Sequence, residues 1–123
     1  MGPNIKIAAQ LARLAGWLAV VVISILSLVP GILRPHIGAP PKLEHVAAYL
    51  ITAGLLSLGY RSPRQLAIIA VTLSLYSGLL EIGQIFVPGR SAAVSDFLAS
   101  SAGAFIGCGL AWIVLRLLKR DFA

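Results

Sequence analysis

Charged residues are scarce in this chain, which has four Asp and Glu and ten Lys and Arg among its 123 residues. They make up 11% of the sequence, whereas a water-soluble domain usually carries about 25%. Hydrophobic residues make up 59% of it. A chain of this composition would aggregate in water. The sequence therefore excludes a soluble globular domain and indicates a membrane protein.

Cysteine is almost absent. The single cysteine, Cys108, lies between two glycines inside an apolar run, so it cannot form a disulfide within the chain. No zinc-binding motif surrounds it, and the two histidines are His45 and His36, the latter in a proline-rich segment. From the sequence alone we expect no cofactor.

Acidic residues are too few to balance the basic ones, and the formal net charge is +6. A nucleic-acid-binding protein concentrates its basic residues on one face or arm. Here they occur singly or in short pairs at the edges of apolar runs, a distribution typical of membrane topology signals. The sequence therefore predicts no nucleic-acid partner.

Long apolar runs dominate what the sequence does contain. A helix needs roughly 20 residues to cross a bilayer core, and breaks rich in proline and glycine separate four apolar runs. We expect an all-α fold with four transmembrane helices, at about residues 8–30, 43–60, 64–87 and 95–118. These crossings use nearly the whole chain, so residues 1–123 are expected to form a single multi-pass domain.

The basic residues also predict the orientation, because they concentrate on the cytoplasmic side of membrane proteins. Three of them fall on the side opposite the termini, Arg34, Lys42 and Arg90, whereas seven fall on the side of the termini, Lys6, Arg13, Arg61, Arg64, Arg116, Lys119 and Arg120. Both termini are therefore expected in the cytoplasm. The acidic residues are distributed in the opposite way: Glu44, Glu81 and Asp96 lie on the outer side, and only Asp121 lies on the inner side.

Glu81 is the most informative acidic residue. It follows Gln65 by sixteen residues, which places it about 24 Å along the third helix. A carboxylate at that depth costs roughly 2.5–3.5 kcal/mol unless it has a partner or water. The expected helix ends bring further polar residues to the same level: Lys42, His45, Gln84, Arg90, Ser91 and Asp96, with Tyr49 one turn below His45. We therefore expect a polar pocket at the outer end.

The residues of this expected pocket allow several roles. Glu81, assisted by His45 or Asp96, is a candidate general acid or base. The alternatives are a structural ion pair of Glu81 with Arg90 or Lys42, and a helix cap at Asp96. The same three residues can also ligate a metal ion, although no second histidine at helical spacing supports one. Anion binding is expected from the remaining candidates, Lys42, Tyr49, Gln84, Arg90 and Ser91.

A stripe of small residues marks the fourth expected helix, where Ser95, Ala99, Gly103, Gly107 and Ala111 recur every four residues. Such a stripe lets another helix approach closely. We expect the third helix to supply the facing groove through Ser74 and Gly78. The Gly103/Gly107 stripe also allows oligomerisation.

The ordered set of polar motifs resembles the VanZ-like family. The motifs are Lys42-x-x-His45-x-x-x-Tyr49, Glu81-x-x-Gln84, Pro88-Gly89-Arg90-Ser91, Asp96-Phe97-Leu98 and Gly103-x-x-x-Gly107. The resemblance extends from about residue 41 to 108 and departs from the family pattern twice. Pro41 replaces an Asp that usually precedes the lysine, and Ser100 replaces an Asn that usually follows Asp96 by four residues.

The resemblance implies a small multi-pass protein of the bacterial cytoplasmic membrane, in a family whose namesake is associated with resistance to the glycopeptide teicoplanin. We therefore expect membrane lipids as partners. The expected role is binding or remodelling of an anionic cell-envelope group, either a lipid or a wall-precursor head group. Two alternatives stay open. One is an intramembrane acid/base enzyme acting on a lipid-linked substrate, and the other is a non-catalytic scaffold or accessory subunit.

Overall fold

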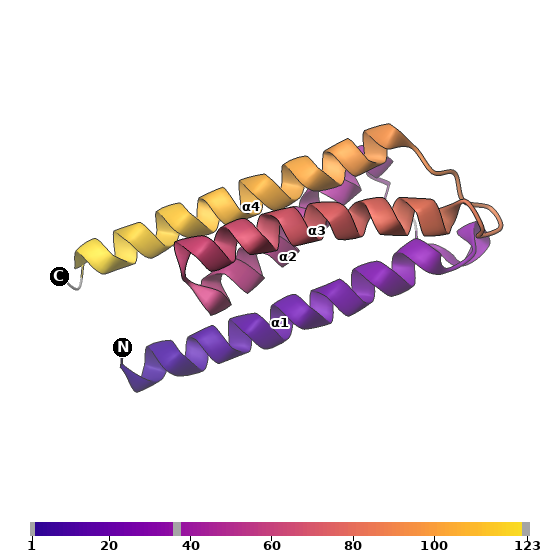
Figure 1. Ribbon diagram of the computed structural model, residues 1–123. Coiled ribbons are helices and arrows are strands. Elements are labelled where there is room, and N and C mark those ends of the chain that lie inside the picture. Colours follow the sequence, from indigo (N-terminus) through magenta and orange to yellow (C-terminus); the bar gives the residue numbers. More distant parts are fainter. Residues whose placement is uncertain (1, 36–37, 122–123) are drawn as a thin grey trace.

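The chain folds into four helices that run back and forth along one direction, and both chain ends lie at the same end of the bundle (Figure 1). The computed structural model describes residues 2–35 and 38–121, so His36 lies outside the described residues. The helices are α1 (Pro3–Leu28), α2 (Pro41–Tyr60), α3 (Pro63–Gln84) and α4 (Val94–Asp121), with a short 3-10 helix, η1 (Gly31–Leu33), after α1. The described residues contain no strand. The expected all-helical fold is confirmed.

Three of the helices begin at a proline: α1 at Pro3, α2 at Pro41 and α3 at Pro63. Proline suits the first helical position, because its backbone φ angle is already helical and the amide hydrogen that it lacks would have no partner there. In the predictions from the sequence, Pro41 and Pro63 were interpreted only as breaks and Pro3 was not used. Each of the three helices therefore begins one to five residues earlier than expected.

Three helices are long and apolar enough to cross a membrane: Pro3–Leu28, Pro63–Gln84 and Val94–Lys119. The remaining helix, α2, is not in this set, because polar residues, including Glu44 and His45, lower its hydropathy. The outward surfaces of the long helices agree with a lipid environment. On α1, for example, Leu14 and Leu18 are 67% and 64% exposed, and large exposed apolar surfaces mark sites of membrane or protein contact.

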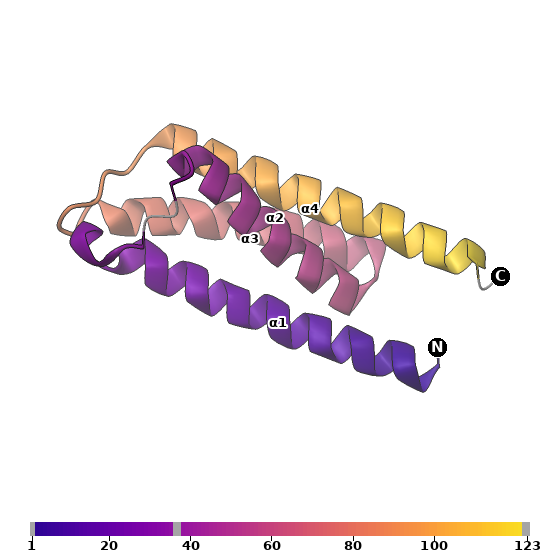
Figure 2. The same cartoon turned by 180° about the vertical axis from the view of Figure 1, so that it is seen from behind.

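The core lies between α2, α3 and α4. Its buried members include Tyr49 and Ala53 of α2, Leu73 of α3, and Ala104 and Cys108 of α4. Cys108 accepts a hydrogen bond from the Ser57 hydroxyl at 3.2 Å. In the view from behind, α2 crosses between α1 and α4 (Figure 2), and α2 and α4 form the most extensive helix contact.

The small-residue stripe of α4 faces α2, and the expected pairing of this stripe with α3 is wrong. A Cβ atom placed on Gly103 would overlap the backbone carbonyl of Val46, and one on Gly107 would overlap that of Leu50. The backbones of α2 and α4 are therefore in direct contact. α3 meets a different face of α4, where the hydroxyls of Ser74 and Ser101 are 2.6 Å apart.

Candidate functional site

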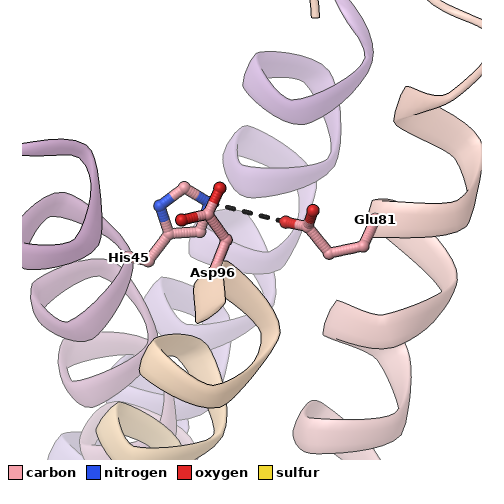
Figure 3. A group of neighbouring side chains, drawn as sticks. All are labelled: His45, Glu81 and Asp96. Carbon is pink, nitrogen blue, oxygen red and sulfur yellow. Dashed lines mark ion pairs between the residues drawn. The ribbon is translucent and has the colours of Figure 1, made fainter. Parts of the chain in front are cut away.

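Three ionisable side chains meet at the end of the bundle opposite the termini. His45 lies in the second turn of α2, Glu81 in the last turn of α3, and Asp96 in the first turn of α4. Each contributes one polar atom to a group in which all atoms lie within 4.8 Å of one another. Figure 3 shows the three side chains converging from three separate helices. The structure thus brings together the three residues that the sequence analysis singled out for chemistry.

The imidazole of His45 is held in a defined tautomer. Its Nδ1 atom lies 2.7 Å from the Pro41 carbonyl oxygen. A carbonyl oxygen can only accept a hydrogen bond, so Nδ1 must carry the hydrogen. The other nitrogen, Nε2, faces Oε1 of Glu81 at 3.8 Å. In neutral His45 this Nε2 presents a lone pair, and in protonated His45 it forms an ion pair with Glu81.

Glu81 is nearly buried, with 9% of its surface exposed. Its Oε2 atom accepts a hydrogen bond from the backbone N–H of Ala93 at 3.0 Å. Ala93 directly precedes α4, so Glu81 helps to fix where that helix begins. A backbone donor also stabilises the ionised carboxylate, and Oε1 remains directed toward His45.

The expected ion pair of Glu81 with Arg90 or Lys42 is not formed. Among the side chains that the structure describes, in residues 2–35 and 38–119, the ion pairs are Arg34 with Glu44 at 2.6 Å and His45 with Glu81 at 3.8 Å. Arg90 instead donates hydrogen bonds to the carbonyl of Val29 at 3.0 Å and to that of Leu26. The guanidinium is therefore committed to the end of α1, where the last helical carbonyls lack partners within the helix.

Gln84 has the same kind of partner as Arg90, because its side-chain amide donates to the Ser27 carbonyl at 3.1 Å. Together the two side chains attach the end of α1 to the end of α3. Burial, followed by the nearby charge of Arg34, lowers the pKa of Arg90, while Glu81 raises it. Arg90 is thus an anchoring residue as well as one of the cations of this region.

Two pockets open beside the three ionisable side chains. The first, which we call the loop pocket, has a volume of about 550 Å³ and is lined by Arg34, Lys42, Gln84, Arg90, Ser91 and Asp96, among others. The second, the side pocket, has a volume of about 320 Å³ and includes Arg34, Glu44, His45, Tyr49, Gln84 and Arg90. All five residues expected to bind a ligand therefore line one or both pockets. Tyr49 reaches the side pocket from the core, with 3% of its surface exposed.

The sequence analysis did not include Arg34 and Glu44 in the site. Arg34 lines both pockets and pairs with Glu44, which lines the side pocket. A signal was present, because both residues belong to the few charges expected on the outer side. Their pairing crosses the proline-rich segment between η1 and α2, and no helical periodicity relates them.

The expected helix cap at Asp96 is also not formed. Among the described residues, the carboxylate of Asp96 forms no hydrogen bond with a backbone N–H group, whereas the Asp96 amide itself donates to the Ala93 carbonyl at 3.0 Å. Its carboxylate is instead directed toward His45 and Glu81 and lines the loop pocket.

Among known protein families, a model described as VanZ/LLP1 matches residues 19–116, which include the whole of α2 and α3, most of α4 and the last ten residues of α1. No curated protein and no solved structure matches the chain.

Proposed function

Because the chain belongs to the VanZ/LLP1 family of VanZ-like proteins, we propose that it crosses the bacterial cytoplasmic membrane four times and uses its loop pocket to bind or remodel an anionic envelope group. The group would be the phosphate-bearing head of a lipid or of a wall precursor. The family link to teicoplanin resistance would then act through the display of such groups at the cell surface.

One observation carries this proposal: three basic side chains, Arg34, Lys42 and Arg90, line one pocket at an end of an apolar helix bundle. Arginine and lysine are the side chains that bind phosphate and carboxylate groups most strongly. Arg34 is paired with Glu44, and Arg90 donates to α1 carbonyls. Lys42 is exposed and forms no ion pair with a described residue. Its ammonium group is therefore the most accessible anchor for an anion.

The proposed topology rests on the arrangement of the helices and on the charge distribution. An even number of crossings places both termini on one side, which fits α2 as a fourth crossing that packs against α4. The pocket end carries three of the ten basic residues, so the positive-inside rule directs it away from the cytoplasm.

Cysteine labelling tests this topology. In a Cys108→Ala background, Ser91→Cys places a thiol in the α3–α4 loop and Arg64→Cys places one at the opposite end, at two exposed positions. We expect a membrane-impermeant maleimide added to intact spheroplasts to label Ser91→Cys, and to label Arg64→Cys only after permeabilisation. The reverse pattern, or equal labelling of both, would disprove the outer location of the pocket.

The binding proposal predicts that Lys42→Ala weakens the affinity for phosphatidylglycerol. One lysine near an anionic head group contributes about 1 kcal/mol, which corresponds to roughly a fivefold change in affinity. The measurement is native mass spectrometry of the detergent-solubilised protein with phosphatidylglycerol, and phosphatidylcholine serves as the reference lipid.

Lys6→Ala is the matched control for this measurement, because it removes the same charge from an exposed residue at the opposite end of the bundle. We expect it to leave the affinity for phosphatidylglycerol within about twofold of the unmodified protein. If both variants bind as tightly as the unmodified protein, or if both lose the same affinity, the loop pocket is not the site.

The geometry of His45 and Glu81 favours acid/base catalysis on a lipid-linked substrate as a second candidate. The Glu81 carboxylate and the His45 imidazole face each other at 3.8 Å, and the Pro41 carbonyl already fixes the other imidazole nitrogen. A small approach of the two groups would bring them to the hydrogen-bond distance that proton transfer requires. In the same binding measurement, Glu81→Gln separates the candidates, because it keeps the shape of the side chain and removes its titration. If Glu81→Gln still binds the head group but no longer changes the lipid composition of the cell as the unmodified protein does, catalysis is favoured. If Glu81→Gln affects the lipid composition as the unmodified protein does, binding without catalysis is favoured.

A further inference from the structure

His45, Glu81 and Asp96 converge, and each can ligate a metal ion, a capacity that head-group binding in the loop pocket does not use. We propose that His45, Glu81 and Asp96 bind a divalent transition-metal ion of the Zn²⁺ or Mn²⁺ class. One nitrogen and two carboxylate oxygens lie within 4.8 Å of one another, each on a different helix. The inference concerns the same end of the bundle as the proposed function and extends it, but binding of the metal alone requires no head group.

The first argument is the charge of the cluster. Glu81 and Asp96 are two carboxylates in close proximity, and Glu81 is nearly buried. Like charges repel strongly where water is scarce. Two of the neighbouring cations are engaged elsewhere, because Arg34 pairs with Glu44 and Arg90 holds the end of α1. Lys42 lines the loop pocket with Asp96 but forms no ion pair with either carboxylate. A dication between the two carboxylates would remove this repulsion.

The second argument is the outer shell around the ligand atoms. A metal-binding histidine almost always donates its other ring N–H to a carbonyl or carboxylate, which fixes the tautomer and the ring orientation. His45 does so through Nδ1 and the Pro41 carbonyl at 2.7 Å, and Nε2 is left facing the cluster. Glu81 is oriented in a similar way by the Ala93 N–H at 3.0 Å, which occupies Oε2 and leaves Oε1 directed inward.

The set of donors selects the class of metal. Imidazole nitrogen suits Zn²⁺ and other transition metals, whereas carboxylate oxygens also suit Mn²⁺. Ligand atoms around a tetrahedral zinc ion are about 3.3 Å apart when the bonds are about 2.0 Å long. The 3.8 Å between His45 Nε2 and Glu81 Oε1 therefore closes with a small rotation of either side chain.

Three protein ligands leave at least one coordination position open, as in catalytic zinc sites. Asp96 lines the loop pocket and His45 lines the side pocket. An oxygen of an anionic head group that enters either pocket can therefore reach the ion. The metal ion would thus add two positive charges to the proposed anion site, in which Lys42 is the most accessible anchor.

Metal binding to the purified, untagged protein tests this inference. The protein in detergent is stripped with chelator, and binding of ZnCl₂ and of MnCl₂ is followed by isothermal titration calorimetry, in buffer without phosphate or anionic lipid. We expect one ion per chain for at least one of the two metals. Asp96→Asn and His45→Asn should each lower the affinity at least about tenfold. Thermal unfolding without metal establishes that the variants are folded.

Asp121→Asn is the matched control, because it removes a carboxylate from the same helix as Asp96 but at the opposite end of that helix. It should bind the metal as the unmodified protein does. Absence of binding by the unmodified protein, or an equal loss of affinity in Asp121→Asn and Asp96→Asn, would overturn the metal site. The phosphatidylglycerol measurement with Lys42→Ala is run in the presence of chelator, so failure of one proposal is distinguishable from failure of the other.

Discussion

Replacing Gly107 by alanine is expected to lower the free energy of unfolding by about 1–3 kcal/mol, the usual cost of forcing extra atoms into a packed interior. The added Cβ would overlap the Leu50 carbonyl of α2. That oxygen belongs to a helix backbone and cannot rotate away as the end of a side chain can. The two helices must therefore separate. Unfolding in mixed micelles of mild detergent and SDS, followed by circular dichroism, measures the loss.

Gly109 supplies the control for this prediction, because it lies on the same helix, two residues away, and a Cβ there has no atom within 4 Å. Gly109→Ala should leave stability unchanged or raise it by up to about 1 kcal/mol, since alanine has less conformational freedom to lose than glycine. Equal stabilities of Gly107→Ala and Gly109→Ala would contradict the close contact of α2 with α4.

The second large effect is expected from Arg90→Ala, which removes the donors to the Leu26 and Val29 carbonyls at the end of α1. A hydrogen bond from a charged group contributes about 1.5–3 kcal/mol when it is well shielded. Arg90 is only partly buried, so we expect a loss of about 2 kcal/mol in the free energy of unfolding. Arg90→Lys should lose an intermediate amount, because an ammonium lacks the planar fork that reaches both carbonyls.

Arg64→Ala removes the same side chain from an exposed position at the opposite end of the bundle. Surface substitutions of this kind usually change stability by less than about 0.5 kcal/mol. If Arg90→Ala were as stable as Arg64→Ala, the attachment of α1 through Arg90 would be wrong. Arg90 would then be free to serve mainly as an anion ligand.

The first of these predictions is linked to the site by the position of α2. The Val46 carbonyl contacts Gly103 of α4, and Val46 is the residue next to His45. The glycine contacts therefore help to set the distance of His45 on α2 from Asp96 on α4.

Local features of the sequence were sufficient to predict the helices and the level of the polar residues. Apolar runs and breaks indicated four helices, and counting residues from the breaks placed His45, Glu81 and Asp96 at one end. The starts of α2 and α3 were placed too late, because a proline can either end a helix or begin one, and Pro3 was not used to place the start of α1. Only the residues around it in space decide between these roles.

Contacts between distant segments could not be predicted in the same way. The glycines of α4 indicate that a helix comes close, but the pattern does not specify whether α2 or α3 does so. Arg90 likewise lies near Glu81 and Asp96 in the sequence, but in the structure it donates to backbone carbonyls at the end of α1. Every residue carries such a carbonyl, so no sequence pattern identifies these partners. Partner choice depends on which groups the whole fold leaves unsatisfied.

In the proposed function, side chains from α2, α3 and α4 form one site for an anionic group at the end of the bundle opposite the termini. The most direct measurement is a titration of the isotope-labelled protein in micelles with short-chain phosphatidylglycerol, followed by amide chemical shifts. We expect the largest shifts around Lys42 and His45, at Glu81, and from Arg90 to Asp96. Largest shifts around Lys6, Arg61 and Arg116 at the other end, or shifts spread evenly over the helices, would contradict it.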